Sequence, residues 1–262
     1  EKAVSHLGQV GTAVHIEGAV NAATLVVTGN RNLQKETQEA YMRQAGLAQY
    51  GQEGENCIVF DEYPFAFNGL GITNKIRSTL YLLDLKTCAL KQLTFGTVKV
   101  DQIAIHPSGA EIAFSGIDYT DFADYRYGLY IYSLAQDTTR CVFAPGKYHI
   151  AQMVYLNDHE LMFVAGKHEK EAIMQCPEFM HVDLATDAVT LLCNQDLSVG
   201  NSIGSDCRYG SGQSMAVEGE TIYFLSVIED ESCILSCDKQ GRLKTVVANG
   251  GSIDMFDIQG DC

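Results

Sequence analysis

The stretch TLYLLDLKTCALKQLTFGTVKVDQIAIHPSGAEIAFS, residues 79–115, decides the fold of this chain. It contains two pairs of apolar runs, each pair enclosing a turn: Leu80–Leu85 with Leu90–Thr94, and Gln102–Ile105 with Glu111–Phe114. Short runs rich in β-branched and aromatic residues, divided by Asp, Ser, Pro and Gly turns, are typical of antiparallel strands. The stretch therefore predicts two consecutive β-hairpins.

This pattern recurs along the chain with a period of roughly 50 residues. The turn of the first hairpin begins at Asp84. The corresponding positions further along the chain are Ser133, Asp183 and Asp238. Four short antiparallel strands in each period form one blade of a β-propeller, and each blade buries its faces against its neighbours. The sequence therefore predicts an all-β fold, a β-propeller of four-stranded antiparallel blades. Residues 80–94 would close one blade and residues 102–114 would begin the next.

A period of this size leaves room for about five blades, of which the terminal ones are incomplete. Residues 252–257 are predicted to be the first strand of a further blade. A β-sandwich would show shorter periods, and a doubly wound fold would alternate helices with strands. The one helical segment expected here is a short excursion near residues 33–48, after strands near Thr12–Ile16 and Ala23–Val27. We expect residues 1–262 to form a single propeller domain that carries this excursion.

The bulk composition excludes several classes of protein. The formal net charge of −15 would repel the phosphates of nucleic acid, so we expect no nucleic-acid partner. No apolar run approaches the roughly 18–20 residues that span a bilayer. Glu1-Lys2 opens directly onto ordinary sequence without a signal peptide. We therefore expect a cytoplasmic protein without a membrane segment, and the missing initiator Met predicts a segment of something longer.

The cysteines and histidines do not predict a metal centre. The nine cysteines are scattered, and three residues separate the closest pair, Cys233 and Cys237. No histidine pair lies at ligand spacing beside a cysteine pair. The acidic run at residues 118–124 lacks the glycine and the terminal glutamate of an EF-hand loop. We expect reduced thiols in the core, no metal and no cofactor.

One motif matches a catalytic signature but lacks its context. Residues 200–204, GNSIG, fit the G-x-S-x-G nucleophile elbow, which needs a strand before it and a helix after it. The residues that follow favour a loop. The hydrolase order of Ser, acid and His also fails, because no histidine occurs after His181. The sequence therefore predicts no catalytic residue in this chain, Ser202 included.

Asp61 and Glu62 form the acidic pair of most interest. They precede Tyr63-Pro64-Phe65 and a glycine-punctuated loop. Two adjacent carboxylates on a loop can hold a cationic group such as a free α-amine. The alternative is a strand-ending acidic turn before a proline, and the sequence leaves both interpretations open.

Several segments resemble the propellers of one peptidase family. Residues 61–81, DEYPFAFNGLGITNKIRSTLY, look like a propeller segment of the acylaminoacyl-peptidase-like members of the prolyl oligopeptidase family. Residues 105–114 are similar to a hairpin of those propellers and of TolB-like propellers. Residues 197–206, with 221–224, resemble the later blades. The resemblance covers most of residues 56–257.

The resemblance implies a two-domain serine peptidase, whose propeller caps an α/β-hydrolase domain, restricts access to it and supplies substrate contacts. In that family the catalytic serine, aspartate and histidine lie on the C-terminal hydrolase domain, which residues 1–262 do not contain. The chain alone is then expected to be inactive. Its expected partners are the hydrolase domain and a peptide substrate, with Asp61 and Glu62 as substrate-binding residues. The family's propellers commonly have about seven blades, so this chain would be a partial ring, whose open edges favour a homodimer.

A stand-alone propeller scaffold, TolB-like or WD-repeat-like and without an enzymatic role, is the competing interpretation. The chain has no Trp, which excludes a literal WD signature. The segment at residues 61–81 favours the peptidase domain.

Overall fold

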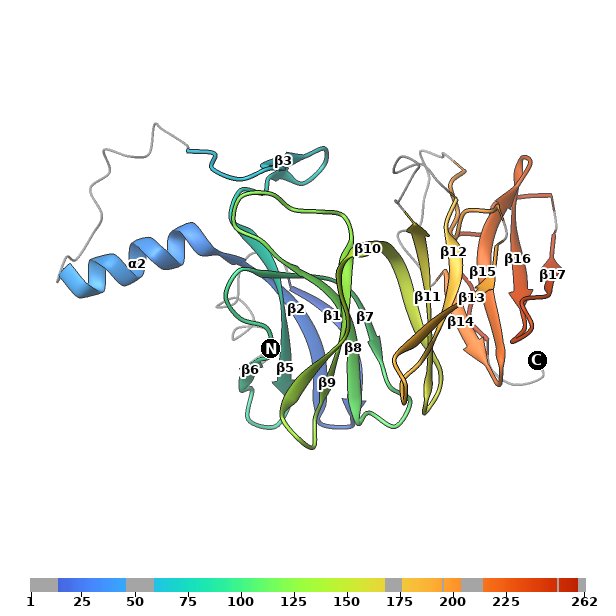
Figure 1. Ribbon diagram of the computed structural model, residues 1–262, viewed down its shortest axis with the longest axis horizontal. Helices are drawn as coiled ribbons and strands as arrows, with labels where there is room; N and C mark the ends of the chain where they lie inside the picture. The colour runs from blue at the N-terminus through green and yellow to red at the C-terminus, as the bar shows by residue number, and fades with distance from the viewer. Residues whose placement is uncertain are drawn as a thin grey trace. The chain divides into compact units, whose positions relative to one another are not determined.

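The computed structural model describes residues 14–45, 59–167, 176–194, 196–203, 214–248 and 250–258. Strands dominate these residues, and every ladder between paired strands is antiparallel (Figure 1). The predicted all-β, propeller-type fold is therefore confirmed. The chain divides into two compact units. The first comprises Glu1–Asp101 with Ser115–Tyr125, and the second comprises Gln102–Phe114 with Arg126–Cys262.

The first unit is built on a four-stranded sheet. Its strand order is β1 (Val14–Asn21), β2 (Thr24–Asn32), β5 (Ile76–Asp84) and β6 (Leu90–Gln92). Its core includes Val27, Tyr81 and Leu83, which pack together. Residues 12 and 13 of the first expected strand lie outside the described residues.

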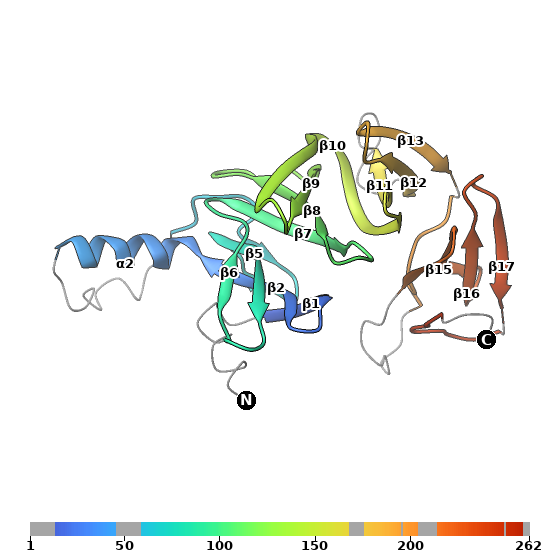
Figure 2. The same cartoon turned by 90° about the horizontal axis from the view of Figure 1, so that it is seen from below.

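Two short excursions separate β2 from β5. Helix α2 (Leu33–Ala45) falls where the sequence predicts a helical segment, and the Asn32 side chain accepts the first-turn N–H of Lys35 at 3.0 Å, as an N-cap does. Figure 2 shows α2 running away from the sheet that precedes it.

The second excursion is the hairpin of β3 (Ala66–Phe67) and β4 (Gly71–Ile72). The expected strand at Cys57–Phe60 is not formed at residues 59 and 60, and residues 57 and 58 lie outside the described part.

A seven-stranded sheet follows. Its strand order is β13 (Ala188–Cys193), β12 (Glu178–Asp183), β11 (Glu160–Lys167), β10 (Thr138–Asn157), β9 (Tyr127–Ser133), β8 (Glu111–Asp118) and β7 (Val98–Ile105). Strand β10 is 20 residues long. Its first half pairs with β9 and its second half pairs with β11, with a break in register between Phe143 and Tyr148. One strand thus serves two successive groups of four.

The last sheet has four strands. They are β14 (Met215–Glu218), β15 (Thr221–Ile228), β16 (Glu231–Cys237) and β17 (Leu243–Val247), in that order. With β10 shared, the described residues hold four consecutive groups of four strands. The boundary predicted within residues 79–115 is found, because β6 ends one group and β7 begins the next.

The prediction of a further strand at residues 252–257 is wrong. This segment has no ladder partner among the described residues. Side chains take its backbone groups instead: Asn201 Nδ2 donates to the Ile253 carbonyl at 3.0 Å, and Ser232 Oγ accepts from the Ile253 N–H. Because these groups are already satisfied, the apolar pattern alone does not make a strand there.

The four turn positions that define the period perform the same task. The side-chain oxygens of Asp84, Asp183 and Asp238 each accept two backbone N–H groups of the turn that follows, at 2.8–3.2 Å. Ser133 Oγ accepts the N–H of Gln136 at 3.4 Å. Asp and Ser close turns in this way because their short side chains reach the backbone two to four residues ahead. The repeat seen in the sequence is therefore a repeat of turn chemistry.

Three of these turns are also tied to the other hairpin turn of their own group. A backbone N–H one residue past the capping position donates to a carbonyl in the neighbouring turn. The pairs are Leu85 to Ala23 at 2.8 Å, Leu134 to Ala110 at 3.0 Å, and Leu184 to His159 at 2.9 Å. Three of the four groups of strands therefore have their two hairpin turns joined at one end.

The turn carboxylates predict an acid-sensitive fold. Backbone hydrogen bonds hold the pKa of Asp84, Asp183 and Asp238 below the usual value. A carboxyl with a lower pKa in the folded chain stabilises the fold above its unfolded pKa of about 3.9, and that contribution is lost as pH falls through the folded pKa. Tm should therefore drop below about pH 4.

The triple variant Asp84→Asn/Asp183→Asn/Asp238→Asn keeps the acceptor oxygens but not the titratable groups. In a series of melting curves at different pH values, its Tm should fall less steeply with decreasing pH. An identical pH slope in both proteins would contradict this.

The six cysteines in the described residues are free thiols. Cys193, Cys233 and Cys237 are buried as expected, and burial raises the pKa of Cys237 to about 12. Cys141 and Cys176 are exposed, so the expectation of core thiols is wrong for these two.

Candidate functional site

Glu62 lies at the centre of a buried ion pair in the first unit. Its side chain and that of Arg77 are both 0% exposed. Arg77 Nη1 donates to Glu62 Oε1 at 3.1 Å and Nη2 donates to Oε2 at 2.8 Å, which is the bidentate geometry of a strong charge-assisted pair. The backbone N–H of Lys75 also donates to Oε1, at 2.5 Å. The carboxylate is thus fully engaged inside the protein.

Arg77 has no unused donor. Nε donates to the Thr97 carbonyl at 2.9 Å, and the second bonds of Nη1 and Nη2 go to the carbonyls of Ile76 and Tyr119, each at 3.1 Å. With Glu62 these bonds use all five N–H groups of a guanidinium. The guanidinium also stacks 3.7 Å from the centroid of the Tyr119 ring, and burial raises the pKa of that tyrosine. One side chain on β5 therefore joins three other segments of the first unit.

Asp61 has a different environment. Lys75 Nζ lies 3.4 Å from Asp61 Oδ2 and 3.8 Å from Glu62 Oε2, and donates to the Thr120 carbonyl at 2.9 Å. Two carboxylates are thus matched by two cations, Lys75 and Arg77. The Asp61 side chain remains 55% exposed, whereas that of Glu62 presents no surface to an external amine. The binding of substrate amines stays a prediction, and Asp61 alone is placed to make direct contact.

Several exposed aromatic side chains lie on either side of Glu62 in the sequence and at Phe122. They are Phe60, Tyr63, Phe65, Phe67 and Phe122, with exposed Leu70 at the hairpin tip. Ring centroids lie 4.7 Å apart for Phe60 and Phe65, and 6.0 Å apart for the stacked pair Tyr63 and Phe122. Figure 1 shows the β3–β4 hairpin beyond the end at which β5 begins. The exposed rings thus form two close pairs in the first unit.

Lys99, on β7, lies beside Phe67. Its Nζ is 5.8 Å from the centroid of the Phe67 ring, within the range of a cation–π contact. Burial lowers the pKa of Lys99, which outweighs the opposing effect of Asp101. Lys99 is not one of the residues that close the turns between strands.

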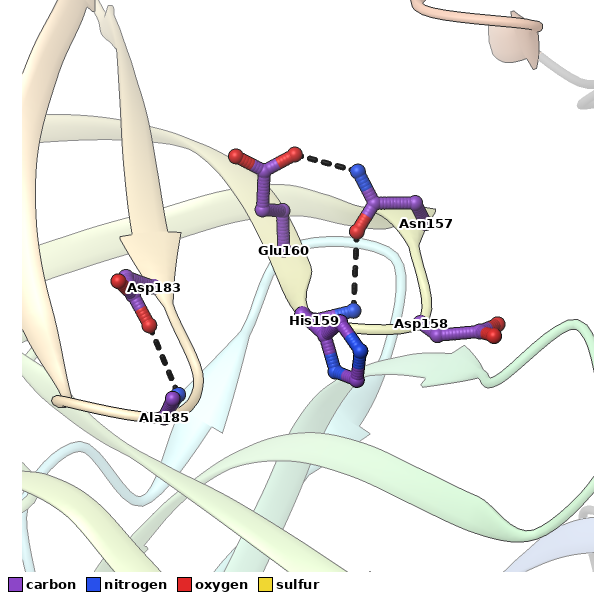
Figure 3. Close-up of a pocket in the computed structure, with 6 residues that line it drawn as sticks. All are labelled: Asn157, Asp158, His159, Glu160, Asp183 and Ala185. Atoms are coloured by element: carbon purple, nitrogen blue, oxygen red, sulfur yellow. Dashed lines mark hydrogen bonds between the residues drawn. The ribbon is translucent and has the colours of Figure 1, made fainter.

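A hollow of about 640 Å³ lies in the second unit, between two hairpin turns (Figure 3). Its walls are Asn157, Asp158, His159, Glu160, Asp183 and Ala185. Two of the carboxylates there already have partners: His181 Nε2 and Lys239 Nζ each lie 3.1 Å from Glu160, and Asp183 closes its own turn. The hollow is therefore a gap between turns rather than a set of groups poised for chemistry.

The remaining motifs gain no catalytic context. Ser202 lies in an irregular segment, and Gly204 and the residues that would form the rest of an elbow lie outside the described part. Within the part of the chain that the structure describes, no group of three or more His, Cys, Asp or Glu side chains could hold a metal ion. No helix in those residues is long and apolar enough to cross a membrane.

Sequence reasoning found Glu62 but missed its partner. Arg77 lies on the same face of β5 as Thr79, Tyr81 and Leu83. All four residues are buried. An arginine on the inward side of a strand requires a carboxylate, and the acidic pair Asp61 and Glu62 lies nearby in the sequence. That periodicity could have revealed the pair. No signal in the sequence points to Lys99, because its environment depends on the placement of the β3–β4 hairpin.

The sequence matches no family model, and no curated protein matches it either. Solved structures do share the fold. An acylaminoacyl peptidase from Pyrococcus horikoshii aligns over 95% of this chain and 34% of its own, with a TM-score of 0.63 and 15% identity. An acylaminoacyl peptidase in complex with Z-Gly-Gly-Phe-chloromethyl ketone aligns over 91% of this chain and 32% of its own, with a TM-score of 0.59 and 14% identity. The chain spans about a third of the length of these proteins. At such identities the likeness shows the fold alone: this chain has the fold of the β-propeller part of these peptidases.

Proposed function

We propose that this chain is the propeller domain of a cytoplasmic serine peptidase, where it caps a hydrolase domain and gates or selects short peptide substrates. The observation that carries the proposal is the alignment of almost the whole chain with about a third of an acylaminoacyl peptidase. The remaining two thirds of such a protein leave room for a catalytic domain. The chain itself then contributes access control and contacts, and it supplies no catalytic residue.

One feature of the structure supports this proposal: a buried ion pair holds the segment that carries the predicted substrate contact. The Glu62–Arg77 pair fixes the segment that carries Asp61. A rigid scaffold that positions a loop is a common arrangement for binding residues. In this proposal the hydrolase domain and the peptide substrate are the partners, and open sheet edges can pair in a homodimer.

The isolated chain should not hydrolyse peptide p-nitroanilides. The expected result is a rate equal to that of buffer, because in this proposal the nucleophile and its general base lie on the hydrolase domain. Hydrolysis that disappears in the Ser202→Ala variant would contradict the non-catalytic role. The reading frame beyond Cys262 supplies the matching genetic test: further blades and then a strand–G-x-S-x-G–helix unit are expected. A propeller with no hydrolase sequence would favour the stand-alone scaffold.

Asp61 predicts a selective effect on substrate binding. In the full enzyme, Asp61→Asn should raise KM about two- to fivefold for peptides with a free amino terminus, the magnitude of one exposed charge contact. Peptides with a blocked amino terminus should keep their KM. Asp61 is the residue to change, because a change at Glu62 would also disrupt the buried pair. Equal KM values for both proteins with free-amine peptides would return Asp61 to a purely structural role.

A further inference from the structure

Two buried thiols from neighbouring groups of strands meet in the second unit. Cys193 is the last residue of β13, in the third group of four strands, and Cys237 is the last residue of β16, in the fourth. Both belong to the apolar core that these two groups share, where Cys193 is 8% exposed and Cys237 is 0% exposed. The two thiol groups lie within hydrogen-bonding distance of each other.

The close approach of these strands depends on Gly241. This glycine lies in the turn between β16 and β17, and its φ is +74°. A Cβ added there would collide with the carbonyl oxygen of Leu192 and lie 3.6 Å from Cys193 Cβ. Only glycine therefore lets this turn lie directly against the end of β13. The fourth group of strands is thus fitted against the third at the point where the two thiols meet.

The chemistry of two adjacent thiols favours a redox role over a metal site. A structural metal ion bound by cysteines takes about four ligands. In the part of the chain that the structure describes, no group of three or more His, Cys, Asp or Glu side chains could hold one. Two thiols in contact have what a disulfide needs, since its formation joins two sulfurs and removes two electrons.

We propose that Cys193 and Cys237 form a disulfide when the chain folds under oxidising conditions, and that this bond fastens the fourth group of strands to the third. The closed loop would contain all of β14 and β15, so the bond would restrict the unfolded chain and stabilise the fold. In a reducing compartment such as the cytoplasm the pair remains two thiols. The pair thus makes the stability of the chain respond to redox conditions, independently of the function proposed above.

A small disulfide such as oxidised glutathione is the oxidant in this proposal. The Cys193 thiolate attacks one glutathione sulfur and releases one glutathione thiolate, and the Cys237 thiolate then attacks Cys193 Sγ and releases the second. One S–S bond of glutathione breaks and one S–S bond of the protein forms. The two protons that the cysteines lose are taken up by the two glutathione thiolates.

Burial determines when this exchange can occur. It raises the pKa of both thiols, to about 12 for Cys237, so few thiolates are present in the folded chain, and glutathione has little access to either sulfur. The bond should therefore form during folding, while both thiols are still accessible. Once formed, it should be shielded from reductants for the same reason.

Refolding of the 262-residue chain from urea tests this proposal. One sample refolds in a mixture of reduced and oxidised glutathione and another in dithiothreitol, and the remaining thiols are then alkylated. Peptide mapping of the oxidised sample should give Cys193–Cys237 as the main linked pair. The Tm of this sample should exceed that of the reduced sample by about 5–10 °C.

Two variants show whether this bond causes the rise in Tm. Cys193→Ala should remove the difference between the oxidised and reduced samples. Cys141→Ala, which removes an exposed thiol, is the matched control and should keep the difference.

Three outcomes would overturn the proposal: a peptide map without the Cys193–Cys237 pair, an oxidised sample whose Tm is equal to or below that of the reduced one, and a rise in Tm that survives in Cys193→Ala. Should Cys193→Ala fail to fold, the peptide map and the two melting curves of the wild-type chain still decide, because they need no variant. None of these measurements involves a hydrolase domain, so their failure leaves the proposed function to the tests of hydrolysis and reading frame.

Discussion

Replacing Arg77 with methionine is expected to lower the free energy of unfolding by about 3–5 kcal/mol, the usual effect of removing one partner from a buried ion pair. The change leaves the Glu62 carboxylate buried without a countercharge. It also removes the donors that satisfy the carbonyls of Thr97 and Tyr119. Urea unfolding at pH 7, followed by the fluorescence of the tyrosines, measures the loss.

Two further variants isolate the cause of that loss. Arg242→Met removes an exposed arginine that pairs with Asp238 in a turn, and should change stability by less than about 0.5 kcal/mol. The double variant Glu62→Leu/Arg77→Met should recover much of the stability, because an apolar pair of similar volume can replace a buried ion pair. An Arg77→Met protein as stable as the wild type would show that the pair does not hold this segment.

Phe163→Ala is expected to cost about 3–5 kcal/mol, the range for removal of a buried phenylalanine. Phe163, on β11, is fully buried, and its ring centroid lies 5.6 Å from that of Phe143 and 5.2 Å from that of Tyr148. Both neighbours belong to β10, on either side of its break in register. The cavity would therefore open where one strand passes between two groups of four.

The matched control for this change is Leu191→Ala, on β13 of the same sheet. Leu191 is exposed, so its removal should cost less than about 1 kcal/mol. Urea unfolding of both variants measures the difference. Equal losses for Phe163→Ala and Leu191→Ala would contradict the placement of Phe163 in the core.

The regular part of the fold could be predicted because its signals are local. Asp84, Asp183 and Asp238 bind the backbone within four residues of themselves, so the turn, the strand before it and the strand after it are all encoded in one short stretch. The spacing of these turns then gave the four-stranded groups without any long-range information.

The features that were missed or wrong depend on contacts between distant segments. The continuity of β10 through two groups of strands, including the Phe143–Tyr148 break, cannot be read from a repeat that treats each group alone. Residues 252–257 have a strand-like pattern, but Asn201 from elsewhere in the chain takes their backbone groups. The sequence singled out the acidic pair, and its binding of a substrate stays a prediction. The burial of Glu62 was not foreseen, because it depends on Arg77, 15 residues away.

The most direct test of the domain assignment uses the natural product of the gene, captured with antibodies raised against this chain and treated with a fluorophosphonate probe that labels activated serines. The captured polypeptide is expected to be labelled and to be longer than 262 residues, and the isolated chain is expected to stay unlabelled. A natural product that carries this propeller and does not react with the probe would contradict the peptidase assignment.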